Sequence, residues 1–291
     1  MDSVEFVHSY KHDQALRDSF NALATKTFGL NFEAYYQHGY WSERYNPYSL
    51  VNESGEIVAN VSVNMLSLLI HNKETQAIQI GTVMTDERYR YKGYSTWLMK
   101  KVMEDFAHVD VMYLYANQSV LDFYPKFGFL PKQETLYTYP VVKREVESSA
   151  PKKLSGHSTA DRYFIYQKAQ NRSAISTCFS TVYAAELVMF YCLYVFPDHL
   201  YYVEKENAIV IAQHEGAVLH LFDVISEQKV DLETVIHSLV LENTTKVILH
   251  FTPSDDLACE KEVYEDSNVL FVRQEGELFP KEFKHPMTSQ A

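Results

Sequence analysis

Residues 83–95 read VMTDERYRYKGYS, and this stretch decides how the chain is interpreted. Its apolar start is typical of the end of a β-strand, and the pattern after Gly93 is typical of a helix. Between the two lie the basic side chains Arg88, Arg90 and Lys92. The first turn of a helix has unpaired backbone N–H groups and a partial positive charge, so it attracts anions. The stretch therefore predicts a binding site for a phosphorylated ligand.

Hydrophobic periodicity on either side of this stretch predicts a mixed order of helices and strands. In chain order we expect a helix over 12–27, strands over 48–52, 56–65 and 77–85, a helix over 92–106 and a strand over 111–116. The turn at 53–55 joins the first two strands as a β-hairpin.

A second motif follows the strand at 111–116 and covers residues 117–129, NQSVLDFYPKFGF. The two motifs together resemble the signatures of the GNAT superfamily of acyl-CoA-dependent N-acyltransferases. The matching positions are Arg90, Gly93 and Ser95 in the first motif and Asn117, Phe123, Tyr124, Gly128 and Phe129 in the second. Ser95 and Val120 depart from the small apolar residues that are usual at their positions.

This resemblance implies an α/β (α+β) fold, with a GNAT-like mixed central sheet flanked by helices over residues 1–145. The polar stretch 146–160 predicts a linker. Residues 161–291 then predict a second, smaller domain, either GNAT-like or an unrelated α+β domain. Its expected elements are a helix over 160–192, strands over 200–203, 208–213 and 217–225, a helix over 231–239 and a strand over 246–251. Its loop 226–232, SEQKVDL, has no glycine, so we expect no cofactor site there.

By resemblance, the first domain takes acetyl-CoA as co-substrate in a gap between two splayed strands. Free backbone groups of Val83, Met84 and Thr85 would pair with the pantetheine arm. The pyrophosphate would lie on the segment made of Arg90, Tyr91, Lys92, Gly93, Tyr94, Ser95 and Thr96. Asn117 would hydrogen-bond the cofactor arm near its thiol end.

The catalytic residue that the resemblance implies is Tyr124, as a general acid towards the thiolate leaving group. The superfamily usually builds its acceptor pocket from a segment equivalent to the aromatic stretch 28–48. We name Glu33 as the candidate base from this stretch, and His38 and Glu43 stay open as alternatives.

Composition excludes several classes of protein. The formal net charge is −12, so the chain has no overall positive charge that would attract nucleic acid or an anionic membrane. The three cysteines are few and odd in number, and no signal-like start is visible, which favours a cytoplasmic protein. No metal-ligand spacing occurs, so we expect no metal. The apolar run 182–197 is too short to span a bilayer and predicts a buried helix.

The sequence thus predicts an N-acetyltransferase that acetylates a primary amine, with a small cationic molecule as the favoured acceptor. Two other functions stay open. One is a non-catalytic acyl-CoA sensor or interaction module, and the other is a peptide or protein N-acetyltransferase. A homodimer is possible.

Overall fold

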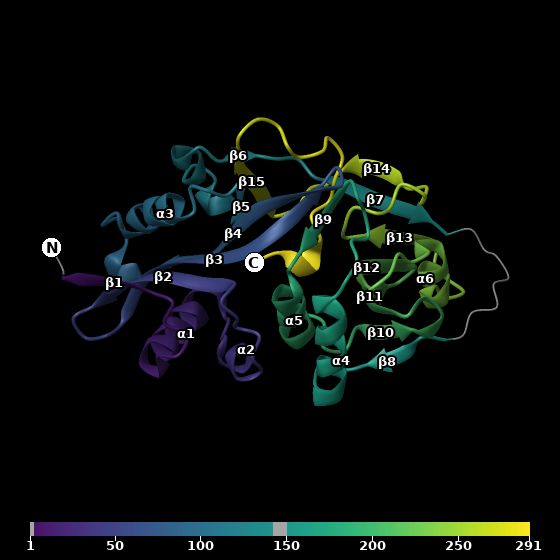
Figure 1. Cartoon of the computed structure of the whole chain (residues 1–291), viewed down its shortest axis with the longest axis horizontal. Coiled ribbons are helices and arrows are strands. Elements are labelled where there is room, and N and C mark those ends of the chain that lie inside the picture. Colours follow the sequence, from purple (N-terminus) through teal and green to yellow (C-terminus); the bar gives the residue numbers. More distant parts are fainter. Residues whose placement is uncertain (1–2, 142–149) are drawn as a thin grey trace.

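The structure, a computed structural model, describes residues 3–141 and 150–291. Two mixed β-sheets lie side by side, each flanked by helices (Figure 1). The mixed α/β class predicted from the sequence is therefore confirmed.

The first sheet carries the two sequence motifs at the edge where β4 and β5 end. Its strands run in the order β1 (Val4–His8), β2 (Tyr45–Asn52), β3 (Ile57–Ile70), β4 (Lys73–Thr85), β5 (Val111–Asn117), β15 (Asn268–Gln274) and β6 (Leu130–Pro131), and β9 (Phe179–Val182) pairs with the far end of β3. Its helices are α1 (Gln14–Phe28), α2 (Glu33–Gln37) and α3 (Tyr94–Asp105). Only β4 and β5 are parallel, because α3 connects them as a crossover.

The second sheet repeats this arrangement. Its strands run in the order β14 (Glu260–Val263), β7 (Thr135–Pro140), β13 (Lys246–Leu249), β12 (Val218–Ile225), β11 (Ala208–Glu215), β10 (Leu200–Val203) and β8 (Lys152–Leu154). Its helices are α4 (Thr159–Gln170), α5 (Ala185–Tyr194) and α6 (Leu232–Leu239). Here β12 and β13 are the parallel pair, and α6 connects them. Short 3₁₀ turns lie at Glu87–Tyr89, Gln118–Val120, Tyr124–Phe127, Glu204–Glu206 and Met287–Ser289.

The two halves of the chain exchange a strand. Strand β15, from the end of the chain, lies between β5 and β6 of the first sheet. Strand β7, from the first half, lies between β13 and β14 of the second sheet. Figure 1 shows both crossings, with the yellow β15 beside β5 and the teal β7 beside β13. The expected domain limits 1–145 and 161–291 stay predictions. Each range contributes one strand to the sheet formed mainly by the other range, β7 to the second sheet and β15 to the first.

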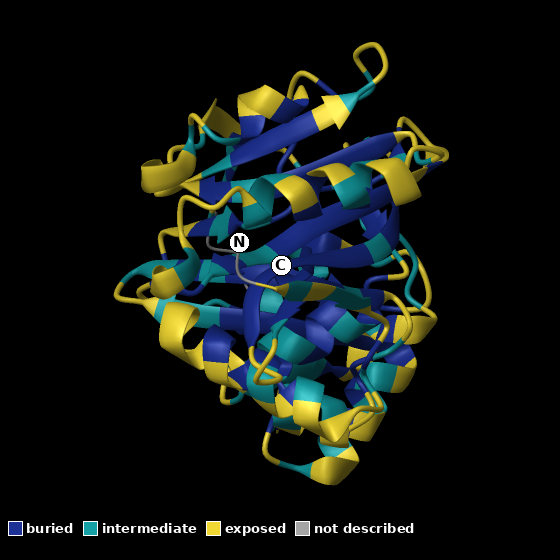
Figure 2. Cartoon of the chain, turned by 90° about the vertical axis from the view of Figure 1, so that its left-hand side faces the viewer, coloured by how far each residue is buried: buried dark blue, intermediate teal, exposed yellow. Residues whose placement is uncertain are grey.

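A shared apolar core joins the halves. One cluster of buried side chains contains Phe20 and Tyr35 from α1 and α2 together with Val188 from α5 and Ile209 from β11. A second cluster packs α3 against the other face of the first sheet, and a third packs α6 against the second sheet. Strands are therefore buried between helices, whose outer faces are exposed (Figure 2).

One element differs from expectation. The sequence predicts a single helix over 160–192, whereas the structure has α4, then β9, then α5. Residues 179–182 leave the helical pattern because they pair with Ser67–Ile70 at the end of β3. The apolar run 182–197 does contain a largely buried helix, α5, as expected.

The linker expected at 146–160 lies partly outside the described residues, which stop at 141 and resume at 150. Its described part contains β8 and the start of α4. No helix among the described residues is long and apolar enough to cross a membrane.

Candidate active site

A gap opens between β4 and β5. The two strands pair in parallel only over Ala77–Ile80 and Val111–Leu114. Beyond that point β4 continues along β3 to Thr85, and β5 continues along β15 to Asn117. Backbone N–H and C=O groups on the facing edges of 81–85 and 115–117 therefore lack strand partners across the gap, and an extended ligand with amide groups can supply them.

A β-bulge on β4 lies at the start of this gap. The register with β3 shifts between Asn60 and Ser62, and Thr82 has a φ of +48°. The Asn60 Nδ2 atom donates to the carbonyl oxygen of Thr82 at 2.8 Å. Left-handed backbone is unfavourable for a β-branched residue, so it persists only where its surroundings hold it. Asn60 is fully buried, and its hydrogen bond to Thr82 stabilises this conformation.

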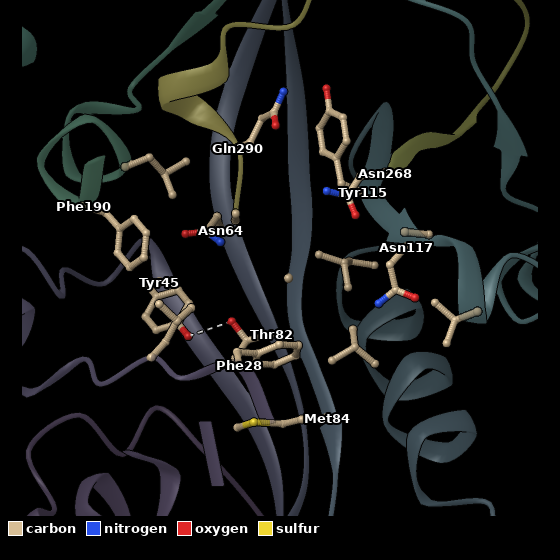
Figure 3. A pocket seen from close by; sticks show the side chains of 18 of the residues that line it. Phe28, Tyr45, Asn64, Thr82, Met84, Tyr115, Asn117, Phe190, Asn268 and Gln290 are labelled. Carbon is tan, nitrogen blue, oxygen red and sulfur yellow. Dashed lines mark hydrogen bonds between the residues drawn. The ribbon is translucent and has the colours of Figure 1, made fainter. Parts of the chain in front are cut away.

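A cavity of about 560 Å³ occupies the gap and extends to both sides of it. Of the predicted site residues, it is lined by Val83, Met84, Thr85, Ser95, Asn117 and Tyr124. Figure 3 shows Met84, Thr82 and Asn117 around it. The structure thus brings residues from both sequence motifs to one cavity.

The predicted phosphate segment forms the start of α3. Gly93 is the N-cap residue with a φ of +83°, and no side chain caps the helix. The first N–H groups of α3 are therefore available to an anionic ligand. Ser95 and Thr85 share a hydrogen bond of 2.7 Å between their hydroxyl oxygens, which fixes the helix start against β4.

The other side chains of this segment surround the helix start. Arg90 is about half exposed and lies 3.9 Å from a carboxylate oxygen of Glu87. Tyr91 is fully exposed with a φ of +64°. Lys92 lies over the ring of Tyr89 at 4.6 Å. Tyr94 and Thr96 are half-buried in the first turn of α3.

Tyr124 opens a 3₁₀ turn and points its ring into an aromatic cluster. Its ring centroid lies 5.2 Å from that of Phe123 and 5.9 Å from that of Phe271 on β15. Burial raises the pKa of Tyr124 to about 12, so the phenol stays protonated at neutral pH. Within the described residues, no protein group hydrogen-bonds its hydroxyl. Tyr124 thus brings a protonated phenol to the lining of the cavity.

Asn117 ends β5 at the rim of the same cavity. Its side-chain oxygen accepts from the backbone N–H of Ser119 at 3.0 Å. This hydrogen bond orients the amide and leaves its Nδ2 group for a ligand.

Glu33 is not among the residues that line the cavity. Its carboxylate accepts from Arg17 Nε at 3.4 Å and from Gln37 Nε2 at 2.7 Å. The alternatives His38 and Glu43 do not line the cavity either, and Glu43 forms an ion pair with Lys11. The neighbours Phe32 and Tyr35 do line it, because they lie on the side of this short helix that faces the core.

Sequence reasoning missed the residues that the second half contributes. Leu187, Phe190 and Tyr191 of α5 line the cavity, as do Asn268 of β15 and Gln290 near the end of the chain. The sequence carries no motif at these positions, and only the exchange of strands and the packing of α5 bring them to the site.

The equivalent position in the second half differs in charge. The N-cap residue of α6 is Asp231, whose carboxylate accepts from Glu233 N at 3.0 Å. Two carboxylates at this helix start would repel a phosphate, which supports the expectation that the second half holds no cofactor.

Residues 11–131 match the family model of the acetyltransferase (GNAT) domain. By this match, residues 11–131 are a GNAT domain. The strand gap, the bulge and the uncapped helix described above all lie within this GNAT domain.

Solved structures share the fold of the whole chain at low identity. A conserved protein of unknown function from Enterococcus faecalis, described as a probable N-acyltransferase, is 14% identical with a TM-score of 0.61, and the match covers 94% of this chain and 73% of that one. Eis1 from Mycobacterium abscessus is 16% identical with a TM-score of 0.61 and the same coverage. A GCN5-related N-acetyltransferase from Kribbella flavida is 15% identical with a TM-score of 0.56, covering 94% and 71%. No curated protein sequence matches the chain.

Proposed function

We propose that the GNAT domain transfers an acetyl group from acetyl-CoA to a primary amine. The observation that carries the proposal is that the gap between β4 and β5 and the buried phenol of Tyr124 belong to one cavity. A thioester held in this gap would have a proton donor beside it.

The residues present fit acetyl-CoA. The unpaired edge of β4 at Val83, Met84 and Thr85 suits the amides of the pantetheine arm, and Asn117 offers a further amide on the opposite edge. The uncapped start of α3, with Arg90 and Lys92 near it, suits the pyrophosphate. The co-substrate supplies an activated acyl group as a thioester.

The chemical step is direct attack of the amine nitrogen on the thioester carbon. The carbon–sulfur bond of the tetrahedral intermediate then breaks, and Tyr124 donates its proton to the departing sulfur. A phenol with a pKa near 12 is a suitable donor because it is fully protonated before the step. The ammonium proton must leave before attack, and we assign no side chain to that step because no aspartate, glutamate or histidine lines the cavity.

Calorimetric titration of the full chain with acetyl-CoA tests the proposal. We expect about one molecule bound per chain, and loss of binding in the Gly93→Val variant, because a side chain there would obstruct a phosphate at the helix start. Gly55→Val is the matched control, since Gly55 has a φ of +82° and equally open space around it. This control should bind acetyl-CoA like the parent chain.

Absence of binding in the parent chain would refute the proposal. Two molecules per chain would show that the second half also holds a site. Release of free CoA when amines are added separates an enzyme from an acyl-CoA sensor.

A further inference from the structure

The second sheet opens at the place that corresponds to the gap in the first. Its parallel strands β12 and β13 pair only over Val218–Leu221 and Lys246–Leu249. Beyond that point β12 continues along β11 to Ile225, whereas β13 ends at Leu249. The second half therefore has a strand opening of its own.

Residues 286–289 of the same chain occupy this opening. On the side of β13, the backbone N–H of Met287 donates to the carbonyl oxygen of His250 at 3.0 Å. On the side of β12, the Thr288 hydroxyl donates to Asp223 Oδ2 at 2.5 Å. A piece of this chain thus lies where the first sheet has its cavity.

Asp223 is fully buried and is fixed by an arginine. Arg172 Nη1 donates to Asp223 Oδ2 at 2.9 Å, and Arg172 Nη2 donates to Oδ1 at 2.6 Å. Without such a partner a buried charge would be costly. A hydrogen bond to a charged acceptor is roughly twice as strong as a neutral one. The hydrogen bond from Thr288 is therefore a strong anchor.

Beyond this anchor the chain crosses to the first half. Ser289 Oγ shares a hydrogen bond of 2.8 Å with Thr181 Oγ1 on β9, and both residues are buried. Figure 1 shows this turn, in yellow, between the two sheets. Gln290 and Ala291 then line the cavity of the first half. Figure 3 shows Gln290 at the end of the cavity away from Met84.

Ala291 lies at the inner end of the gap between β4 and β5. It packs on Gly81, where a Cβ would lie only 3.1 Å from Ala291 Cβ and 3.2 Å from its carboxyl carbon. Gly81 directly follows the last parallel pair, Ile80 with Leu114. A co-substrate that ran from the start of α3 along residues 83–85 would bring its acyl end to this place. Residues 286–291 therefore border the space that the acceptor amine must enter.

We propose that the second half positions residues 286–291 at the acceptor side of the cavity, with Asp223 as the positioning residue. This inference rests on the proposed function and gives the second half a part in it. Asp223 does not line the cavity, so it acts through the segment that it holds. It fixes Thr288, and Gln290 and Ala291 then form one wall of the acceptor site.

The variant Thr288→Val tests the inference, because it removes the anchoring hydroxyl and keeps the size of the side chain. We expect the backbone amides of residues 287–290 to exchange hydrogen about tenfold faster or more, as measured by mass spectrometry. This measurement reports whether the second half holds the segment.

The effect on the acceptor is measured with 2-phenylethylamine, whose apolar body suits the lining residues Phe32 and Phe190. Its KM is taken from CoA release with acetyl-CoA, and its Kd from calorimetric titration into the full chain saturated with CoA. Both should rise about fivefold or more in Thr288→Val, because one wall of the acceptor site is displaced. The affinity for acetyl-CoA should stay unchanged.

Thr244→Val is the matched control in the second half. Thr244 is also buried, and its hydroxyl accepts from the backbone N–H of Leu241 at 2.9 Å, at the other end of β13 from His250. This variant also removes a buried hydroxyl. It should keep the parent values of hydrogen exchange in residues 287–290, of KM and of both affinities.

Parent-like hydrogen exchange in Thr288→Val would overturn the inference, and so would faster exchange with an unchanged KM and Kd for the amine. An equal loss of affinity for acetyl-CoA would also overturn it, because a merely structural defect weakens both ligands. The same holds if the parent chain loaded with CoA does not bind the amine. CoA release in any of these cases leaves the proposed function standing. A parent chain that binds both ligands and releases no CoA refutes the proposed function, and the amine affinities still decide the inference.

Discussion

Tyr124 combines burial with access to the cavity, and this combination sets its chemistry. The ring is 5% exposed and packs on Phe123 and Phe271, while the residue lines the space between β4 and β5. Removal from water disfavours the phenolate and raises the pKa to about 12. The same residue would titrate near pH 10 if it were exposed.

Replacement of this hydroxyl should separate binding from turnover. In the Tyr124→Phe variant we expect kcat to fall by about 10²- to 10⁴-fold, while the affinity for acetyl-CoA stays unchanged. The parent chain should show no fall in kcat between pH 8 and 10, because a group with a pKa near 12 remains protonated there. Steady-state kinetics over this pH range, with calorimetry on the variant, measure both. Unchanged kcat in the variant would remove Tyr124 from the mechanism.

At the scale of elements, the bulge on β4 lies where this strand loses its partner β5, and we propose that the open edge binds the co-substrate. Thr82 adopts a left-handed conformation, and Asn60 on the neighbouring strand holds its carbonyl group. Asn60 also donates to Ser62 Oγ at 2.9 Å and accepts from Ser49 Oγ at 2.8 Å. A fully buried polar network of this kind fixes one conformation because each group in it is satisfied.

The variant Asn60→Ala should loosen the bulge. It leaves the carbonyl of Thr82 without its donor, so we expect a loss of about 1–3 kcal/mol in the free energy of unfolding and weaker binding of acetyl-CoA. Urea unfolding and calorimetry measure the two effects. Asn171→Ala, at the exposed end of α4, removes one side-chain hydrogen bond far from the gap and should affect neither by much. Parent-like binding by Asn60→Ala would show that the bulge is not needed for the cofactor.

At the scale of the whole molecule, the exchange of β7 and β15 makes the halves interdependent. The first sheet needs β15 to cover the outer edge of β5, and the second needs β7 to cover the outer edge of β13. The cluster that joins α1 and α2 to α5 and β11 adds a continuous core. Neither half has a complete sheet of its own, so we expect them to unfold together.

A core change in the second half should therefore destabilise the first. Ile236 of α6 is fully buried, and Ile236→Ala should cost about 2–5 kcal/mol. Both tryptophans, Trp41 and Trp97, lie in the first half, so their fluorescence follows the unfolding of that half. The urea midpoints from fluorescence and from circular dichroism should fall together in this variant, as two-state unfolding requires.

The control for this prediction is Leu241→Ala, since Leu241 is 55% exposed and its loss should change stability little. A fluorescence midpoint that stays at the parent value in Ile236→Ala would show that the halves unfold independently.

The sequence by itself determined the local parts of this protein. The segment around Gly93 and the segment from Asn117 to Phe129 predicted the helix start, the rim residue Asn117 and the position of Tyr124, because backbone conformation and helix ends depend on neighbouring residues. The order of helices and strands followed from hydrophobic periodicity. The residue spacing in the two motifs gave the resemblance to the GNAT superfamily, which implied the mixed α/β class.

The tertiary structure alone decided which strands pair and which residues line the cavity. The exchange of β7 and β15, the interruption of the expected helix at β9 and the place of Phe190 in the cavity lining all depend on contacts between residues distant in the chain. The alternation of apolar and polar residues in a strand specifies which of its faces is buried. It does not specify which other strand lies beside it in the sheet. For the same reason the sequence did not show that the Glu33 side chain lies outside the cavity. Its neighbours Phe32 and Tyr35 line the cavity, while its own carboxylate accepts hydrogen bonds from Arg17 and Gln37.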